Sequence, residues 1–101
     1  MIYKIGNLEF DSIKSELTGS TIAIPQKVPP RIGKLLVHFI DNKNRTVSNE
    51  ELLDEIWNRD RSKMRSLYTH INDLKRMLEV DKSLEFDNVY GKGYGLKEHV
   101  N

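Results

Sequence analysis

Residues 64–78 place polar and cationic side chains at the spacing of one helix face. The apolar positions of this stretch recur at steps of four, three and four residues, the repeat of a stripe along an α-helix, and they are Leu67, Ile71, Leu74 and Leu78. The outer positions carry hydrogen-bonding or cationic groups, and they are Arg65, Ser66, Thr69, Asn72, Asp73 and Arg76. Such a face can bind a polar partner, whereas most amphipathic helices of this kind are simply solvated.

Cations gather at the start of this segment, and carboxylates precede it. Between residues 58 and 79, six cationic side chains stand against three acidic ones, although the net charge of the whole chain is only +1. The densest group is Arg59, Arg61, Lys63 and Arg65, which can meet one phosphate backbone. Residues 48–57 carry four carboxylates and no cation. This polarised distribution favours a nucleic-acid partner more than the whole-chain charge does.

Few residues in this chain could support catalysis or hold a metal ion. The chain has no cysteine, and its three histidines, His38, His70 and His99, form no two-histidine helical metal motif. Gly91-Lys92-Gly93 is too short for a phosphate-cradling loop. We therefore predict that the chain is not an enzyme and uses no cofactor. The absence of cysteine and of any long apolar run predicts a cytoplasmic chain without a membrane segment.

The chain has the size and composition of one folded domain. It has 101 residues, of which 38% are hydrophobic and 31% charged. Over residues 1–28, β-branched and aromatic residues alternate with turn signals such as Gly6-Asn7. These patterns predict short strands over residues 2–5, 8–10, 13–17 and 21–24. We expect a small antiparallel sheet that packs against the helices that follow.

Three helices are predicted over residues 29–79. The first begins near Pro30, because proline is tolerated in the first helical turn. The second begins after Ser48, which can cap it, with Glu51 returning the bond and Val47 serving as a hydrophobic staple. The third is the polar-faced helix described above, joined to the second by a short charged link, as in a helix-turn-helix.

The last part of the chain predicts a β-hairpin with a cation at its tip. A strand over residues 84–89 leads into the tight turn Gly91-Lys92-Gly93, and a second strand follows from Tyr94. The hairpin spans residues 84–97, while residues 97–101 look like a frayed end. The expected fold class is therefore α+β, with an N-terminal sheet, three helices and a C-terminal hairpin.

This order of elements is that of a winged helix-turn-helix. An α-helix fits the major groove of DNA, while cations and backbone amides around it bind phosphates. Three segments, 47–57, 66–78 and 89–96, stand at compatible spacing; they contain the capped helix ending in Ile56-Trp57, the pattern Ile71-x-x-Leu74-Lys75 and the pattern Gly91-x-Gly93-Tyr94. Over nearly its whole length the chain resembles the OmpR/PhoB-type winged-helix DNA-binding domain.

The resemblance implies sequence-specific binding of double-stranded DNA by a bacterial-type transcription regulator. The third helix would enter the major groove, and the hairpin, or wing, would lie at the minor groove. On the helix, the DNA side would consist of Arg65, Thr69, His70, Asn72, Asp73 and Lys75. On the wing, the matching positions are Asn88, Tyr90, Lys92 and Tyr94. The resemblance further implies two copies on a direct repeat and a polymerase-contacting loop over residues 58–63.

The chain departs from the family pattern in two places. Asn72 and Asp73 stand where many members carry two arginines, and Tyr90 stands where many carry an arginine before the wing glycine. An aspartate near phosphates is repelled unless it accepts from a cytosine amino group or pairs with a neighbouring cation.

A second interpretation is a winged helix used for protein contact. The low net charge, Asp73 and the acidic second helix would suit docking onto RNA polymerase or another regulator. The two interpretations differ in salt dependence, because phosphate contacts make affinity fall steeply with salt.

In much of the family a receiver domain comes first, whereas Met1 here opens directly into the first strand, as in a ToxR-like regulator. We expect either a self-standing regulator or the cytoplasmic part of a membrane-anchored one.

Overall fold

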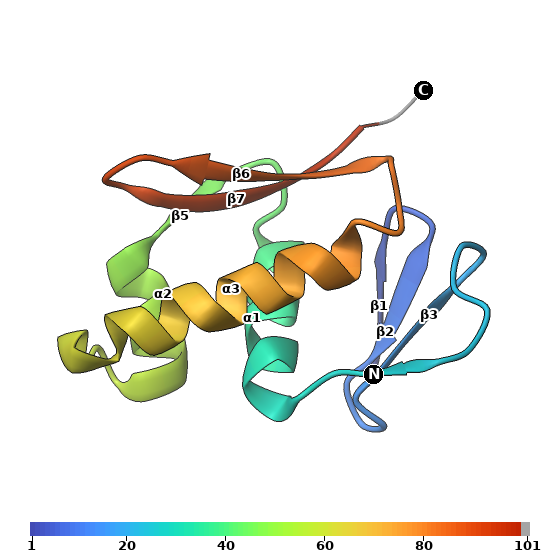
Figure 1. Ribbon diagram of the computed structural model, residues 1–101, viewed down its shortest axis with the longest axis horizontal. Coiled ribbons are helices and arrows are strands. Elements are labelled where there is room, and N and C mark those ends of the chain that lie inside the picture. Colours follow the sequence, from blue (N-terminus) through green and yellow to red (C-terminus); the bar gives the residue numbers. More distant parts are fainter. Residues whose placement is uncertain (100–101) are drawn as a thin grey trace.

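Two antiparallel sheets and three helices make up the fold (Figure 1). The structure is a computed structural model that describes residues 1–99. The first sheet has the order β1-β2-β3-β4, with β1 Ile2–Ile5, β2 Leu8–Asp11, β3 Glu16–Gly19 and β4 Gln26–Lys27. The second has the order β5-β7-β6, with β5 Thr46–Ser48, β6 Leu84–Val89 and β7 Gly93–Glu98. The helices are α1 Pro30–Asp41, α2 Asn49–Trp57 and α3 Met64–Leu78. The predicted α+β winged-helix architecture is confirmed.

The N-terminal sheet differs from the prediction in two strands. Residues 21–24 form no strand; β4 lies further on and pairs with β3. The third strand begins at Glu16 and not at residue 13, because the Asp11 carboxylate accepts hydrogen bonds from the N–H groups of Ile13 and Lys14 and closes a turn there. Residues 21–24 are rich in β-branched side chains, but a strand also needs a partner in register.

One strand of the second sheet was not predicted. β5 pairs antiparallel with β7, with Val47 opposite Tyr94 and Ser48 opposite Gly93. A Cβ atom on Gly93 would collide with the Val47 carbonyl oxygen, so only glycine fits where the two strands meet. β7 also runs on to Glu98, so residues 97 and 98 do not fray as expected. The His99 N–H donates to the Ser83 carbonyl at 2.8 Å, so this residue is held as well. The rest of that prediction falls on residues 100 and 101, outside the described residues.

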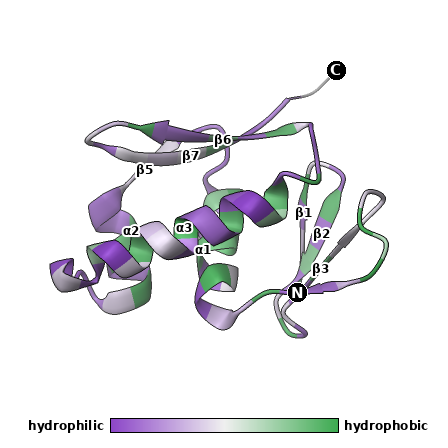
Figure 2. Ribbon diagram, viewed as in Figure 1, coloured by the Kyte–Doolittle hydropathy of each residue, from purple (hydrophilic) through white to green (hydrophobic). Residues whose placement is uncertain are grey.

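A single apolar cluster joins both sheets to all three helices. It combines Leu8 and Phe10 of β2 with the buried faces of α1, α2 and α3, and with Leu96 of β7. Along α3, hydrophilic and hydrophobic residues alternate as an amphipathic helix requires (Figure 2). Its predicted stripe is confirmed, because Leu67, Ile71, Leu74 and Leu78 are all buried. Among the described helices, none has the length and apolar character needed to cross a bilayer.

The start of α2 is fixed by the predicted cap. The Ser48 hydroxyl accepts a hydrogen bond from the Glu51 N–H at 3.1 Å. The Glu51 side chain does not return this bond as expected, because its Oε2 atom lies 2.6 Å from His38 Nε2 and 3.0 Å from Arg45 Nη2. The hydrogen bond with His38 lowers the pKa of Glu51. This carboxylate therefore joins α2 to α1 and to the loop before β5.

Asp81 is buried in the loop that follows α3. Its carboxylate accepts hydrogen bonds from the N–H and side-chain amide of Asn7 and from the N–H and hydroxyl of Ser83. Burial alone raises the pKa of Asp81, but these hydrogen bonds outweigh it and the pKa is lowered. The end of α3 is thereby tied to the turn between β1 and β2.

Candidate nucleic-acid interface

α3 presents one continuous exposed stripe of polar side chains. It is opposite the buried stripe and consists of Arg65, Thr69, Asn72 and Arg76, at steps of four, three and four residues. We call these four residues the α3 stripe. The Thr69 hydroxyl donates a hydrogen bond to the Arg65 carbonyl at 3.1 Å. The stripe therefore combines two guanidinium groups with a hydroxyl and an amide on one face of a rigid helix.

Two predicted residues of α3 lie away from this stripe. His70 is half-buried against Trp57 of α2, with ring centroids 5.6 Å apart, and its Nδ1 atom is buried without a hydrogen-bond partner. Lys75 is exposed, but it borders a hollow beside Leu84 and Phe86 of the second sheet. The resemblance had assigned both to the DNA side. The packing of α3 against α1 and α2 sets its rotation, and this rotation places both residues at the edges of the exposed face.

Asp73 is not an isolated negative charge. Its carboxylate lies 3.5 Å from the Arg76 guanidinium, one helical turn further on. Ser66 is exposed on the same side of the helix, two turns before Asp73. The pairing with a neighbouring cation is one of the two conditions under which an aspartate is tolerated close to phosphates.

The cations ahead of α3 fall into two groups. Arg59 lies 3.6 Å from Asp54, and Arg61 lies 2.5 Å from Glu50, so both pair with the acidic helix α2. The hydrogen bond from Arg61 lowers the pKa of Glu50, which keeps this carboxylate charged. Within residues 1–99, Lys63 and Arg65 make no ion pair. In the predicted cluster, Lys63 and Arg65 can therefore bind a polyanion directly. Arg59 and Arg61 can do so only after their exposed ion pairs with Asp54 and Glu50 break.

The wing tip is a three-residue loop between β6 and β7. Tyr90 at this tip is 97% exposed, Gly91 adopts a φ of +74°, and the Lys92 N–H donates to the Val89 carbonyl at 3.0 Å. Lys92 is exposed and makes no ion pair among the described residues. The tip therefore presents one aromatic ring and one cation to the surroundings.

Tyr94 lies behind the tip, not at it. It pairs with Asn88 across the hairpin, and its ring centroid is 6.1 Å from that of Phe86. Phe86 in turn packs edge-on against Phe39 of α1 at 4.9 Å. This row of three rings joins the wing to the helical core, so the wing packs against the rest of the domain.

The sequence interpretation missed two residues beside the α3 stripe. Tyr68 is 42% exposed and lies three residues after Arg65 and four before Asn72, so helical spacing alone could have identified it. Asn49 begins α2, and its N–H donates to the Lys92 carbonyl at 3.0 Å. No local pattern in the sequence indicates that Asn49 would lie against the wing.

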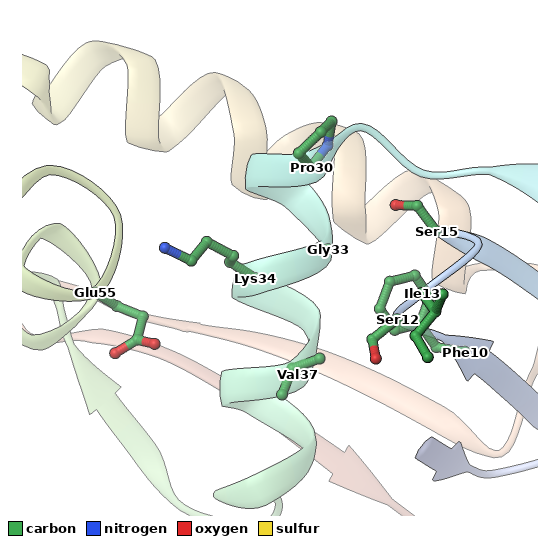
Figure 3. A pocket seen from close by; sticks show the side chains of 9 residues that line it. All are labelled: Phe10, Ser12, Ile13, Ser15, Pro30, Gly33, Lys34, Val37 and Glu55. Carbon is green, nitrogen blue, oxygen red and sulfur yellow. The ribbon is translucent and has the colours of Figure 1, made fainter. Parts of the chain in front are cut away.

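Another hollow, of about 500 Å³, lies between the N-terminal sheet and α1 (Figure 3). Phe10 and Ile13 border it on one side, with Lys34 and Val37 of α1 on the other and Glu55 of α2 nearby. No residue of α3 or of the wing lines it. This hollow is therefore separate from the candidate interface.

The sequence of the chain is similar to those of known transcriptional regulators. Residues 25–96 match the family described as "Transcriptional regulatory protein, C terminal". The chain is 32% identical over 94 residues to the transcriptional regulator HilA of Salmonella typhi; this alignment covers 90% of the chain and 17% of HilA. The chain therefore spans under a fifth of that relative's length.

Solved structures share the fold at low sequence identity. The DNA-binding domain of CpxR from E. coli superimposes with a TM-score of 0.81 and 19% identity, over 99% of both chains. The DNA-binding domain of the response regulator AdeR, solved in complex with an intercistronic region, gives a TM-score of 0.75 and 23% identity over 95% of this chain and 99% of that chain. Since the family match covers most of the sequence, the chain belongs to the transcriptional regulatory protein C-terminal family, the OmpR/PhoB-type winged-helix domains.

Proposed function

We propose that this chain binds double-stranded DNA sequence-specifically, as the DNA-binding domain of a bacterial-type transcription regulator. α3 enters the major groove, and the wing tip with Tyr90 and Lys92 approaches the adjacent minor groove. The observation that carries the proposal is the α3 stripe, a row of hydrogen-bonding and cationic groups exposed along one face of a rigid helix. Membership of a family of transcriptional regulators supports it, as does the fold shared with AdeR, which was solved with DNA.

Three residues of the stripe have roles that their chemistry suits. Arg65, which makes no ion pair among the described residues, binds a phosphate at the start of α3. The Asn72 amide can donate and accept at once, the pattern that adenine presents in the major groove. Arg76 is held by Asp73, so these two side chains act as a pair beside the base edges.

Two copies of the domain bind a direct repeat, each with α3 in a successive major groove. A single copy offers few unpaired cations, because Arg59 and Arg61 are engaged with α2. Binding by one copy is therefore expected to be weak, and a second copy on the same duplex raises the overall affinity. This role places the domain in the cytoplasm, where the chromosome is.

A second candidate function is contact with RNA polymerase or another regulator through residues 58–63. All six of these residues are exposed, and Asn58 and Arg59 both adopt left-handed backbone with φ values of 50° and 65°. Such a strained, protruding loop suits a protein contact. The same loop can serve the DNA-bound domain, so the two functions are compatible.

Fluorescence-anisotropy titration of labelled random and genomic-fragment duplexes, at two salt concentrations, tests the DNA proposal. We expect saturable binding whose log K falls by about 0.9 per phosphate contact for each unit of log salt. The variant Lys92→Ala should weaken binding. If the protein binds no duplex even at low salt, the DNA proposal is wrong and the protein-contact function gains weight.

A further inference from the structure

His38 lies in the last turn of α1, and each of its ring nitrogens faces a carboxylate. Its Nε2 atom lies 2.6 Å from Glu51 Oε2, and its Nδ1 atom lies 3.8 Å from Glu55 Oε2. The two glutamates are four residues apart on α2, so they lie on successive turns of one helix face. One imidazole of α1 therefore meets two carboxylates of the neighbouring helix.

The two contacts make different demands on the protons of the ring. A carboxylate accepts hydrogen bonds and cannot donate them, so the contact with Glu51 requires a proton on Nε2. A neutral imidazole has only one N–H, and its other nitrogen, Nδ1, then carries a lone pair. This lone pair faces the Glu55 carboxylate, so two acceptors oppose each other. A second proton, on Nδ1, converts the opposition into an ion pair.

The other charged groups around this histidine leave that place for the proton open. Arg45, in the loop before β5, lies 3.0 Å from Glu51 Oε2 and shares that carboxylate with the ring. Lys34, one turn earlier on α1, borders the same hollow as Glu55 but makes no ion pair among the described residues (Figure 3). Asp41, three residues after the histidine, is exposed. Among these groups, the ring nitrogen is the one that lies within 4 Å of Glu55.

The pairs are partly shielded from water. The side chain of His38 is 18% exposed, and those of Glu51 and Glu55 are 36% and 44% exposed. The hydrogen bond with His38 is the main cause that lowers the pKa of Glu51, so this carboxylate is charged wherever the ring titrates. Histidine is the side chain that ordinarily changes its charge between about pH 5 and 8. Protonation of the ring thus adds a positive charge next to carboxylates that are already ionised.

We propose that His38 is a proton-dependent link between α1 and α2. The neutral ring binds Glu51 alone, whereas the protonated ring binds Glu51 and Glu55 together. Mild acid therefore tightens the packing of the first two helices. The link is independent of the proposed function, because it concerns the joining of two helices and holds whether or not the chain binds DNA.

The direction of the pH effect follows from where the second ion pair exists. It forms only in the folded chain, so protonation of His38 favours folding. Its stabilisation is present at the acid end of the histidine range and is lost as the pH rises through that range. The buried Asp81 carboxylate acts in the opposite sense, because its pKa is lowered and its stabilisation is lost only in stronger acid. The two effects therefore occupy separate pH windows.

The test is urea denaturation of the full chain at about pH 5.5 and about pH 8, near the two ends of the histidine range. We expect the unfolding equilibrium constant of the wild type to be about three- to tenfold lower at the acid end. Glu55→Gln keeps the shape of the side chain and removes its charge, so most of this gain should disappear while stability at the alkaline end changes little. Asp54→Asn is the matched control, since it makes the same charge change one residue earlier, on a carboxylate that lies 3.6 Å from Arg59.

A second histidine is removed from all the proteins compared. His99 lies 2.9 Å from Glu85 and titrates over the same range, so each measurement is made in a His99→Gln background. His38→Gln should abolish the acid gain, and adding Glu55→Gln to it should change nothing further.

Three results would overturn the link. The first is a wild type whose stability does not rise between the alkaline and the acid end. The second is a Glu55→Gln variant that keeps the full gain, which would mean that Nδ1 does not pair with this carboxylate. The third is an equal loss of the gain in Glu55→Gln and Asp54→Asn, because the effect would then come from the total charge of α2.

Discussion

The Asp81 carboxylate accepts a hydrogen bond from the Asn7 N–H at 2.5 Å, joining the loop after α3 to a turn more than seventy residues earlier in the chain. Two further donors on Ser83 satisfy the same carboxylate. This buried group links the N-terminal sheet to the loop at the C-terminal end of α3.

Replacing Asp81 by asparagine should destabilise the fold in a pH-dependent way. At pH 7 we expect a loss of about 1–3 kcal/mol, because buried donors lose their charged acceptor. The folded-state pKa of Asp81 is lowered, so its stabilisation is present above the unfolded value near 3.9 and is lost as pH falls through the folded-state pKa. Urea denaturation of both proteins at pH 7 and in acid measures this. A difference as large in strong acid as at neutral pH would contradict it; Asp41→Asn, at an exposed carboxyl, is the control.

Arg65→Ala should weaken binding to every DNA sequence alike. The side chain makes no ion pair among residues 1–99, so its loss removes one phosphate contact and reduces the salt slope by about 0.9. Lys14→Ala makes the same charge change in the exposed turn between β2 and β3, outside α3 and the wing. Equal slopes for these two variants would show that Arg65 is not a phosphate contact.

Asn72→Ala should act on sequence preference more than on overall affinity. We expect it to cost about 1–3 kcal/mol on the preferred site and little on random DNA. Selection of binding sites from a random library, followed by titration of the winners against random duplexes, measures the ratio. An equal loss of affinity for both kinds of DNA would show that Asn72 does not contact a base.

Glu50→Gln should strengthen DNA binding. The substitution releases Arg61, which now lies 2.5 Å from the Glu50 carboxylate, and removes a negative charge near the start of α3. We expect an affinity gain of about two- to fivefold at low salt, as the pair is exposed and individually weak. A steeper salt slope should accompany the gain. Unchanged binding would mean that Arg61 does not reach DNA even when it is free.

Gly93→Ala should destabilise the wing far more than Gly91→Ala. A Cβ at Gly93 would collide with the Val47 carbonyl, whereas one at Gly91 meets nothing within 4 Å. We expect a loss of at least about 2–3 kcal/mol for the first and about 1 kcal/mol for the second, where only the positive φ resists a side chain. Thermal unfolding of the two variants measures the difference, and similar losses would argue against β5 pairing with β7.

The features predicted correctly from the sequence are those that local chemistry determines. Ser48 caps α2 because its hydroxyl and the Glu51 N–H are close in any helix that starts there. The buried stripe of α3 follows from spacing alone. By contrast, the Glu51 side chain has several possible partners, and only the packing of α1 on α2 brings His38 within 2.6 Å of it.

The features that were missed depend on contacts between distant segments. β5 has three residues, too few to produce a pattern, and it is a strand only because β7 lies beside it. The ring of His70 packs against Trp57 of α2, a contact that no sequence pattern indicated, while the role at DNA that the resemblance implies for His70 stays a prediction. Asp81 resembles any other loop aspartate in the sequence, so nothing distinguished it from a solvated turn residue.

The pairing of β5 with β7 has a consequence for which kind of duplex this domain accepts. Ser48 is both the last residue of β5 and the cap of α2, so the wing and the helices cannot move apart without breaking the pairing of β5 with β7. The distance between α3 and the wing tip is therefore held constant. In A-form RNA the major groove is deep and narrow and the minor groove wide and shallow. A domain whose helix and wing stay at a constant distance is therefore expected to bind double-stranded RNA poorly. The different groove widths of the RNA duplex would exclude it, without any contact to a 2′-hydroxyl.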